Sequence, residues 1–556
     1  MKNYQKLLKN FLYFILLIFI TYGCGGGGGS SSSNGDQTGE ILPLEEDRTV
    51  YDQDSLNILT LLVEILPGGA TLDEVNANTD WENDLKTEAV VTISEPGYTF
   101  GDGSGFGGGM MRLRGHTSRL AALKSYRIKL DSSTNLWRNH RTLELNKHPY
   151  DLTRMRNKLS FDYFKTIPNM TSLRTQFIQL FIDGVDYGLY TLIERTNELF
   201  LKSHGLDEGG HIYKAEDFEF FRYPNNLKNT DDPTYNEEAF EDILEIRGEK
   251  NDHSKLLSML DDVNDESIDI NTVISTHFQR DNYLTWFAIN ILLGNIDTNS
   301  QNFFLYSPTT SNGWYFLPWD YDGGWDFYGQ PIEVARNTVR RWTQGISNWW
   351  GVVLHKRFIK DPANLQDLVT KATELRNSVF TVAGTTAYLD AYRALIVGSI
   401  TSPPDLDSLL TVADDTPGKI AELNGEIDRL PGVIEQSYQT FINALERPMP
   451  IYLDDPEVND GQIAFNWDES YDLQGDGLTY DFQISTNPSF GAGDIVYESL
   501  NMTTNSIAID ALASGIYYYR VIIRDTKDPN NNWQLPFDSY TDDDNTRYDG
   551  MKQFAI

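Results

Sequence analysis

The stretch that most constrains the fold of this chain is residues 289–326, an apolar segment followed by a polar loop and two short strands. The predicted strands are 302–306 and 314–319. The connection between them is polar and ends in Asn-Gly, which is typical of a hairpin loop. In an antiparallel pair, the start of the first strand lies beside the end of the second. We therefore expect Asn302 and Asp320 to meet at one end of the hairpin.

A third oxygen-bearing side chain, Asp297, lies on the loop that leads into the same end of the hairpin. Two carboxylates and an amide oxygen suit a hard cation such as Mg²⁺, which prefers oxygen ligands and keeps waters that a phosphate can displace. The spacing of five from Asp297 to Asn302, with Asp320 after a hairpin, has the order of the catalytic and metal-binding residues of protein kinases. The spacing alone is equally compatible with ordinary turn residues, because Asp and Asn are common in turns.

Length and charge limit the possible classes of protein. The chain has 556 residues, more than one typical domain needs, so two or three domains are expected. Its formal net charge of −36 at pH 7 argues against nucleic acid as a partner, because phosphate backbones are bound by basic surfaces. The charge carries little information about the fold.

Residues 1–24 have the pattern of a secretory signal peptide. Three lysines precede a continuous apolar run over residues 11–20. This run is too short to span a bilayer comfortably, so a signal peptide is expected rather than a transmembrane helix. Residues 25–45 follow as a tether whose first part is rich in Gly and Ser, a composition typical of flexible linkers.

Cys24 is the only cysteine in the sequence and directly follows the signal core. This arrangement resembles a bacterial lipoprotein, which is cleaved before the cysteine and carries lipid on its sulfur. Thr21 stands where Leu is usual and Tyr22 is bulky, so a plain cleaved signal or an uncleaved anchor with an idle thiol is the alternative. The lipoprotein interpretation predicts a location in the bacterial cell envelope, anchored to a membrane outside the cytoplasm. With one cysteine, packing rather than disulfide bonds must stabilise the fold.

The chain up to about residue 195 is predicted to be rich in strands. Period-two alternation marks strands at residues 57–64, 88–93, 110–115, 124–130, 176–182 and 187–194. A helix is expected over residues 152–166, with Asp151 as its N-cap. The glycine-rich run 101–109 is interpreted as a flexible hairpin tip, because it lacks the GxGxxG frame of a nucleotide-binding loop.

From about residue 198 the pattern becomes helical, with the hairpin set among the helices. Helical segments are predicted at residues 237–246, 252–263, 270–293, 334–359, 363–382, 386–395 and 414–445. Trp342, Trp349 and Trp350 are expected in the core of this part. The expected fold class is therefore α+β, with a β-rich N-lobe, a helical C-lobe and a cleft between them.

Pro448 and Pro450 mark a boundary, beyond which the pattern is all-β. Strands are expected at residues 462–467, 480–484, 506–509 and 515–525. Short strands and turns over residues 448–556 favour an immunoglobulin-like sandwich. The segments FNWDES, YDFQIS and YYYRV resemble a fibronectin type III module, which usually spaces or binds rather than catalyses. We expect this module to fold on its own and to be dispensable for chemistry.

Four blocks of the sequence resemble, in order and spacing, the spore coat protein H (CotH-like) family of atypical secreted protein kinases. These blocks are RLRGHTSRLAALKSYRIKL, DYGLYTLIER, GNIDTNSQNFFLY and WYFLPWDYDGGWD. The resemblance covers roughly residues 57–445 and implies a kinase domain over residues 46–447. It implies ATP and Mg²⁺ or Mn²⁺ as cofactors. The implied acceptor is a Ser or Thr hydroxyl of a secreted or envelope protein, which receives the γ-phosphate.

The resemblance assigns a role to each matching residue. Asp297 matches the catalytic Asp that orients and deprotonates the acceptor hydroxyl, and Asn302 and Asp320 match the metal ligands. Lys124 matches the lysine of the family's Lys-Ser-Tyr-Arg-Ile strand and is expected to contact the ATP phosphates. Asp322 belongs to the same block as Asp320, but residues two apart need not bind one metal.

Residues around the predicted nucleotide site are also implied by the resemblance. Gly115, Ser118 and Arg119 form the loop before Lys124, and this loop would cover the phosphates. Glu194 ends the second predicted hairpin of the N-lobe, where the lobes would be hinged and the adenine would lie.

Two details depart from the family pattern or stay open. His116-Thr117 stands where the family often has Asn-Ser, so the phosphate loop is not fully specified. Asp162, on the predicted helix, is a candidate acidic partner of Lys124, and a solvated helix residue is the equal alternative. A non-catalytic, kinase-like surface scaffold or adhesin is the alternative function, and nucleotidyl transfer is a third possibility.

Cys24→Ala should release the protein from membranes into the soluble fraction, because lipid on the Cys24 sulfur is the expected anchor. The measurement is fractionation of cells that produce the variant, followed by a high-salt wash. Retention on membranes after the wash would contradict the lipoprotein interpretation.

Overall fold

The computed structural model describes residues 40–54, 56–95, 107–248, 251–337, 339–459 and 461–556. Contacts divide the chain into two units, Met1–Glu40 and Ile41–Ile556. The predicted signal peptide, Cys24, most of the tether and residues 101–106 of the glycine-rich run lie outside the described residues. Among the helices in these ranges, none has the length and apolar character that a membrane crossing requires.

The end of the predicted tether is folded. The backbone N–H of Leu44 donates to Asn169 Oδ1 at 3.0 Å, and Tyr315 Oη donates to the carbonyl of Leu42 at 2.6 Å. Ile41 and Leu44 also pack against the main hydrophobic core. Residues 41–44 therefore contact the same body as the domain that the sequence predicts from residue 46.

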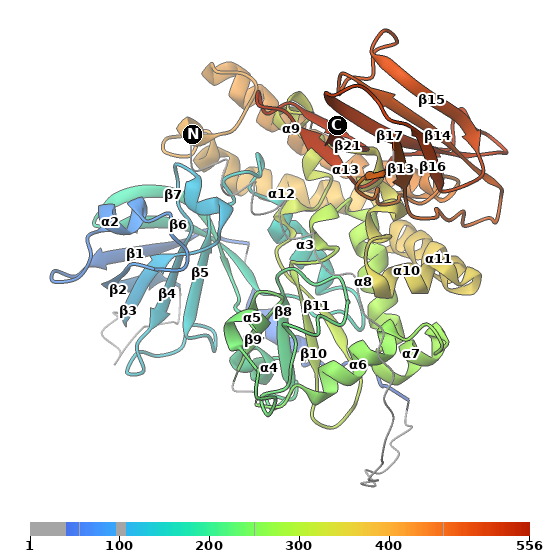
Figure 1. Ribbon diagram of the computed structural model, residues 1–556. Coiled ribbons are helices and arrows are strands. Elements are labelled where there is room, and N and C mark those ends of the chain that lie inside the picture. The colour runs from blue at the N-terminus through green and yellow to red at the C-terminus, as the bar shows by residue number, and fades with distance from the viewer. Residues whose placement is uncertain (1–39, 55, 96–106, 249–250, 338, 460) are drawn as a thin grey trace. The chain divides into compact units, whose positions relative to one another are not determined.

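The strand-rich N-terminal part forms a closed barrel in the order β1-β2-β3-β4-β5-β7-β6 (Figure 1). Its strands are β1 (Leu59–Ile65), β2 (Lys86–Ser94), β3 (Gly107–Leu113), β4 (Tyr126–Leu130), β5 (Thr142–Asn146), β6 (Thr175–Ile182) and β7 (Val185–Ile193). Neighbouring strands are antiparallel, except that β1 and β6 run parallel and close the barrel. Alternate side chains fill the barrel interior with a core of their own.

Sequence periodicity places most of the barrel strands within a few residues but misses β5. Its sequence TLELN does alternate between polar and apolar residues, but the run is only five residues long and all of it except Thr142 is buried. Helix α3 (Arg156–Phe164) lies inside the predicted range, but the N-cap prediction is wrong. Met155 occupies the N-cap position, whereas Asp151 accepts from the N–H of Thr153 and of Arg156.

The predicted hairpin is confirmed and belongs to a second sheet. Strands β10 (Phe303–Ser307) and β11 (Tyr315–Pro318) pair antiparallel, with Phe303 opposite Pro318. Two strands that the sequence analysis misses, β8 (His211–Ala215) and β9 (Leu244–Arg247), extend the sheet to the order β11-β10-β8-β9. Both are short, and β9 lies in a segment predicted as helical.

Apart from the barrel and the second sheet, the described chain before residue 448 is mainly helical. The longer helices are α6 (Ser254–Asn264), α7 (Ile270–His277), α8 (Arg280–Leu292), α10 (Val353–Lys360), α11 (Pro362–Ser378), α12 (Val382–Ile400) and α13 (Thr416–Leu445). The shorter ones are α2 (Leu72–Ala77), α4 (Glu198–Ser203), α5 (Glu237–Glu241) and α9 (Pro331–Ala335). Helix α8 is buried from Asn282 to Leu292 and packs on α11, α13 and β11.

Two long helices predicted from the sequence are interrupted. Residues 270–293 break before Gln279, whose side chain accepts from the N–H of Asn282 and caps α8. Residues 334–359 contain the short 3-10 turns η6 (Arg341–Thr343) and η7 (Gly345–Trp349) before α10 begins. Gly345 has φ +59°, a conformation that ends helical geometry. Trp349 and Trp350 are in the core as expected, whereas Trp342 is partly exposed.

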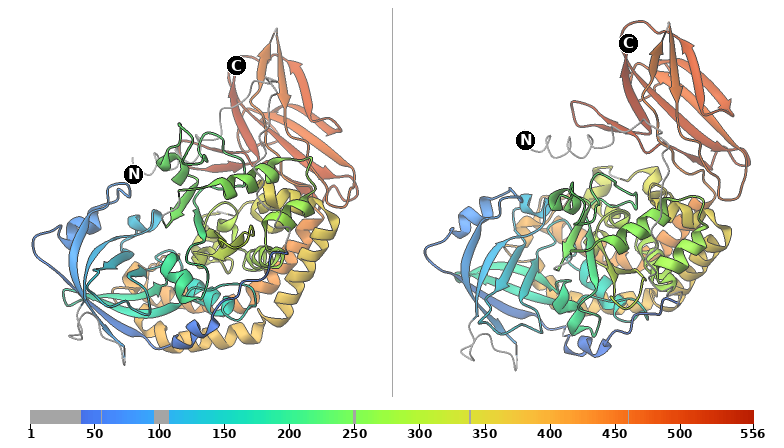
Figure 2. Two further views of the ribbon diagram at one scale, coloured as in Figure 1. Left: turned by 90° about the horizontal axis from the view of Figure 1, so that it is seen from below. Right: turned by 60° about the horizontal axis from the view of Figure 1, so that its bottom comes forward.

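The C-terminal part is all-β, as predicted (Figure 2). One sheet contains β12 (Glu457–Asn459), β13 (Gln462–Asn466) and β16 (Ser506–Asp510). The other contains β15 (Ile495–Met502), β14 (Leu478–Ser485), β17 (Ile516–Asp525), β18 (Trp533–Gln534) and β21 (Met551–Ala555), and β19 (Ser539–Thr541) pairs with β20 (Arg547–Asp549). Phe465 of the first sheet packs on Phe482 and Tyr519 of the second, so one core joins the two sheets.

The all-β part contacts the segment that contains η6 and η7. Arg341 lies 3.7 Å from the centre of the Trp533 ring and donates from Nε to the Trp533 carbonyl at 2.7 Å. Gln534 Nε2 donates to Ser347 Oγ at 3.2 Å in a buried contact. These contacts tie the C-terminal strands to the helical part within the single unit Ile41–Ile556.

Arg341→Ala should lower the free energy of unfolding by about 1–2 kcal/mol, because it removes a cation–π contact and a hydrogen bond to the Trp533 carbonyl. The measurement is urea unfolding of the full chain, with Arg393→Ala, which removes an exposed ion pair, as the control. A chain truncated after residue 447 should unfold at a lower temperature for the same reason. Equal stability of both altered proteins and wild type would instead support the dispensable module that the sequence predicts.

Candidate active site

The end of the β10–β11 hairpin contains two residues in an unusual backbone conformation. Asn302 has φ +60° and Asp320 has φ +55°, in the left-handed region that non-glycine residues rarely adopt. Trp325 and Asp326, just downstream, have φ +54° and +49°. Such conformations cost about 1–3 kcal/mol each and concentrate at functional sites, where the surrounding structure maintains them.

Asp297 and Asn302 are joined directly. Asn302 Nδ2 donates to Asp297 Oδ2 at 2.8 Å and lies 3.3 Å from the main-chain oxygen of Asp297. Gln301 Nε2 donates to the other carboxylate oxygen of Asp297 at 2.7 Å. Because Asn302 uses its amide nitrogen for these bonds, its amide oxygen is the atom that it can offer to a cation.

Asp320 and Asp322 add negative charge beside Asp297. Burial and the charge of Asp322 raise the pKa of Asp320 to about 7. Burial also raises the pKa of Asp297 to about 6, and the charge of Asp322 adds to this effect. Burial, the larger cause of both shifts, disfavours the ionised carboxylates, and a bound divalent cation would favour them.

His148 and Asn157 hold the turn that follows Asp320. His148 Nδ1 lies 3.0 Å from Asp322 Oδ2, and Asn157 Nδ2 lies 3.3 Å from His148 Nε2. Asn157 Oδ1 accepts from the N–H of Tyr321 at 3.3 Å. Burial alone would raise the pKa of Asp322, but the hydrogen bond and charge of His148 hold it below its ordinary value. Neither residue is among those predicted from the sequence, although Pro149 after His148 is a signal for a turn.

The donor set fits a magnesium ion that is completed by substrate. Gly323 lies against the site, since a Cβ there would be 3.4 Å from Asp297 Cβ and 3.5 Å from Asn295 Oδ1. Asn295 Oδ1 is buried without a hydrogen-bond partner. In the part of the chain that the structure describes, no group of three or more His, Cys, Asp or Glu side chains could hold a metal by itself. Mg²⁺ commonly takes one or two carboxylates and completes its shell with water and phosphate.

A cation from the barrel approaches these carboxylates. The guanidinium of Arg114, just beyond β3, lies 5.9 Å from the centre of the Trp319 ring, next to Asp320. Burial lowers the pKa of Arg114, while the charges of Glu144 and Asp320 act in the opposite direction. The site therefore combines carboxylates from the hairpin with an arginine from the barrel. Arg114 lies in one of the four blocks that resemble the family, but the resemblance assigns it no role.

Comparison with known proteins identifies the family. Residues 111–441, more than half of the 556-residue chain, match the family described as CotH kinase protein. The chain belongs to the CotH kinase protein family. Inner spore coat protein H of Bacillus subtilis (strain 168) is 28% identical over 230 residues, which cover 41% of this chain and 61% of that relative. The matched region includes the hairpin and ends before the C-terminal β-strands, so the fibronectin type III resemblance stays a prediction.

Lys124 of the CotH domain does not join the hairpin carboxylates in the contacts that the structure describes. Its Nζ donates to the main-chain oxygen of Arg119 at 2.5 Å, and burial lowers its pKa. The suggested pairing of Lys124 with Asp162 is wrong. Asp162 instead forms ion pairs with Lys158 at 3.1 Å and with Lys165 at 2.9 Å, inside the core around α3.

The predicted phosphate loop is braced from within by Arg119. Only 3% of Arg119 is exposed, because its Nε donates to the Gly115 carbonyl at 2.8 Å and its guanidinium pairs with Asp84 at 2.5 Å. Gly115 has φ +75°, and a Cβ at this position would collide with Ser118 Oγ. The structure thus gives Gly115 and Ser118 a tight turn and places the Arg119 guanidinium inside the loop.

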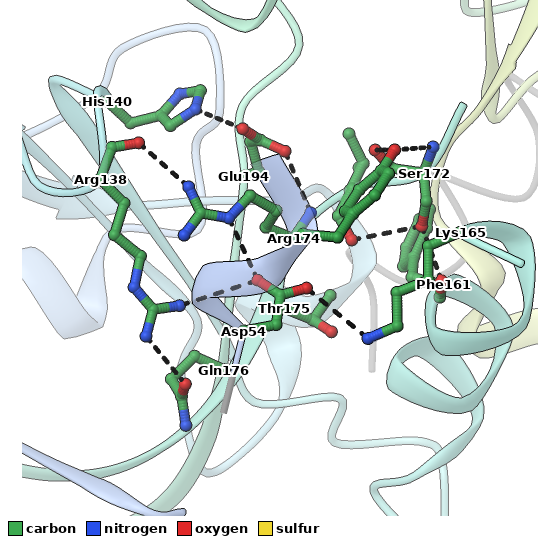
Figure 3. A network of polar contacts seen from close by, with 12 residues as sticks. Asp54, Arg138, His140, Phe161, Lys165, Ser172, Arg174, Thr175, Gln176 and Glu194 are labelled. Atoms are coloured by element: carbon green, nitrogen blue, oxygen red, sulfur yellow. Dashed lines mark hydrogen bonds and ion pairs between the residues drawn. The ribbon is translucent and has the colours of Figure 1, made fainter. Parts of the chain in front are cut away.

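Glu194 lies in a buried polar network (Figure 3). Its Oε2 accepts from the N–H of Arg174 at 3.0 Å and lies 3.1 Å from His204 Nε2, while Oε1 pairs with His140. Arg174 Nε in turn donates to Asp54 Oδ1 at 3.1 Å. The carboxylate predicted to lie near the adenine is therefore engaged by protein groups and links β7 to neighbouring elements.

The stability contributed by His204 should be lost at alkaline pH. Burial alone would lower the pKa of His204, but Glu194 and Glu46 raise it to about 9, above the ordinary value of 6.5. A raised folded-state pKa stabilises the fold fully below about pH 6.5, and this stabilisation disappears as pH rises through 9. His204→Gln should therefore cost about 3 kcal/mol more of unfolding free energy at pH 6 than at pH 9.5.

Urea unfolding of wild type and variant at the two pH values measures this difference. Phe200→Leu is the matched control, because it removes the ring contact with His204 and keeps the ion pairs. The loss of unfolding free energy caused by Phe200→Leu should be the same at the two pH values. An equal cost of His204→Gln at pH 6 and pH 9.5 would show that His204 is not held in its charged form.

Proposed function

We propose that this CotH-family protein is an ATP-dependent protein kinase that transfers the γ-phosphate to Ser or Thr hydroxyls of a secreted or envelope protein. The observation that carries the proposal is the meeting of Asp297, Asn302 and Asp320 at one end of the hairpin. Family membership over residues 111–441 supports it. The chain spans about 61% of the length of the curated relative, so acceptor and partners are part of the proposal.

The barrel would serve as the N-lobe and the helical part as the C-lobe of a kinase-like architecture. Arg114 leaves the barrel at the end of β3 and comes next to Asp320, which leaves the second sheet at the end of β11. The nucleotide would lie where these two elements meet. This arrangement would let one part of the chain hold the phosphates and the other hold the acceptor hydroxyl.

Asp297 would act on the acceptor hydroxyl. Its carboxylate is oriented by Gln301 and Asn302, and its pKa of about 6 suits a proton acceptor that works near neutral pH. The hydroxyl oxygen would form a bond to the γ-phosphorus while the bond to the ADP oxygen breaks, and the hydroxyl proton would pass to Asp297. Asn302 and Asp320 would hold Mg²⁺ or Mn²⁺, which when bound neutralises charge on the phosphates.

We also propose that this protein is located at the cell surface. The curated relative is named as a spore coat protein, which is consistent with a surface or extracellular location. Lipid on Cys24 would anchor this chain to a membrane of the cell envelope. The C-terminal strands would form a fibronectin type III-like module that spaces the kinase or binds a partner.

Asp320→Ala and Asp297→Ala should impair the protein in different ways. Asp320→Ala should weaken metal-dependent nucleotide binding as well as turnover, because this carboxylate would hold the metal. Asp297→Ala should bind Mg-ATP nearly as wild type does but transfer phosphate about 10²-fold more slowly or worse. Asp390→Ala, at an exposed position on α12, is the control and should behave as wild type.

Calorimetry with Mg²⁺ or Mn²⁺ measures nucleotide affinity, and transfer from γ-labelled ATP to a Ser-rich protein measures turnover. Transfer of label from α-labelled ATP would instead indicate nucleotidyl transfer. Wild type that binds no nucleotide with either metal would contradict the kinase proposal and favour a kinase-like scaffold or adhesin. If Asp297→Ala and Asp320→Ala impaired nucleotide binding and phosphate transfer to the same extent, the two carboxylates would not have the separate roles proposed for them.

A further inference from the structure

Arg114, Arg127 and Arg195 surround one buried carboxylate on the outer face of the barrel; we call these three residues the arginine cluster. The carboxylate is that of Glu144, which is 0% exposed. The distances from its oxygens are 3.0 Å to Arg114 Nε, 2.8 Å to Arg127 Nε and 2.7 Å to a terminal nitrogen of Arg195. One negative charge therefore faces three positive charges.

Strand register explains why these residues share a face. Arg127 on β4 lies opposite Glu144 on β5, and Glu144 lies opposite Ile193, two residues before Arg195. The neighbours of Arg127 and Glu144 along each strand point into the apolar core of the barrel. Arg127 is thus held by the pleat of β4, whereas Arg114 and Arg195 closely follow the ends of β3 and β7.

The positive charge extends beyond the three residues. Arg247 of β9 is buried and pairs with Glu245 at 2.6 Å, and Arg112 pairs with Asp84. Burial lowers the pKa of Arg247 to about 10, with the charge of Arg195 adding to the effect. In the same way, burial followed by the charge of Arg127 lowers the pKa of Arg112 to about 10. The excess of positive charge lies in the three guanidiniums that share the Glu144 carboxylate, in a chain of net charge −36.

The arginine cluster lies beside the hairpin site. Arg114 reaches Trp319, the residue before Asp320, and Arg247 lies 5.8 Å from the ring of Phe304 on β10. The side chains of Arg127 and Arg195 are each 20% exposed, so both reach solvent. A ligand beside Asp320 that also reaches these arginines must carry several negative charges along an extended chain.

We propose that the arginine cluster binds the phosphate chain of a nucleoside triphosphate, with Arg127 and Arg195 as the principal contacts. This inference rests on the proposed kinase function and assigns the phosphate-binding role to these residues instead of Lys124. A guanidinium offers five N–H donors in a fork that matches phosphate oxygens. Each arginine directs one nitrogen toward Glu144, so the remaining donors can contact phosphate, and phosphate would balance the excess charge.

Glu144 would position the cluster. The guanidinium groups of Arg127, Arg114 and Arg195 hold its pKa well below the ordinary range in spite of burial, so it stays ionised. Its carboxylate fixes the three guanidiniums at short range, which their mutual repulsion would otherwise oppose. The cluster is thereby arranged before any phosphate binds.

Inorganic tripolyphosphate without added metal tests the inference, because it carries the phosphate chain alone. Arg127→Gln and Arg195→Gln should each weaken tripolyphosphate binding about tenfold or more, measured by calorimetry at low salt. Lys124→Gln is the matched control and should change the affinity less than about twofold. Full retention of binding in Arg127→Gln and Arg195→Gln, or a loss confined to Lys124→Gln, would overturn the inference.

A second test uses Glu144→Gln and measures the unfolding temperature instead of a loss of binding affinity. Without this carboxylate the arginines repel one another, so the variant should unfold at a lower temperature than wild type. Tripolyphosphate should then raise its unfolding temperature by more than it raises that of wild type, because phosphate replaces the missing negative charge. An equal or smaller rise than in wild type would contradict the assignment.

Paired measurements with ATP separate this inference from the kinase proposal. Cluster-dependent binding of tripolyphosphate without phosphate transfer from ATP would support the phosphate site and contradict the kinase function. Undiminished ATP binding and transfer in Arg127→Gln and Arg195→Gln would support the kinase function and overturn the phosphate site.

Discussion

The antiparallel pairing of β10 with β11 is the constraint on which the site depends. Phe303 opposite Pro318 brings the residue before one strand beside the residues after the other. This register places Asn302 near Asp320, and the hydrogen bond from Asn302 then fixes Asp297. A shift of one residue in either strand would turn its side chains to the opposite face relative to its partner and separate the residues at the hairpin end. The core of the sheet therefore protects the geometry of its polar end.

The hairpin side of the site carries an excess of negative charge, and the barrel side carries an excess of positive charge. The hairpin end holds carboxylates whose pKa values are raised by burial, and the barrel face holds more guanidiniums than carboxylates. If the guanidiniums paired fully with the hairpin carboxylates, both groups would be neutralised and neither could bind a charged ligand. The structure instead uses Glu144 to organise the arginines and His148 to hold Asp322. A phosphate chain with a divalent cation would complement both sides at once.

Buried ion pairs join the barrel to the helical part. Lys147 Nζ lies 2.8 Å from Asp405 Oδ1, and Arg156 pairs with Asp151 on one side and Glu426 of α13 on the other. Burial lowers the pKa of Lys147 to about 8, which reflects the cost of taking the charge out of water. Such pairs contribute little net stability, but breaking one leaves an uncompensated charge. We therefore interpret them as contacts that select one packing arrangement of these elements.

The sequence by itself determined the features that depend on near neighbours. The hairpin, the spacing of Asp297 and Asn302, most barrel strands and the all-β C-terminal part follow from local periodicity and turn chemistry. Strand β5 alternates polar and apolar residues but is only five residues long, so its pattern is easily overlooked. The break between α7 and α8 is held by Trp314, whose N–H donates to the His277 carbonyl and whose carbonyl accepts from the N–H of Gln279, a contact between segments far apart in the sequence.

Only the tertiary structure decided which cations approach the carboxylates. Lys124 matches a sequence block, but its ammonium contacts the carbonyl of Arg119. Arg127 lies on β4, Arg114 and Arg195 follow the ends of β3 and β7, and the three meet at Glu144 because the barrel closes and sets their register. Contacts between residues so far apart in sequence are fixed by strand pairing and burial, neither of which has a local signature. The charge pattern around the site is therefore a property of the fold.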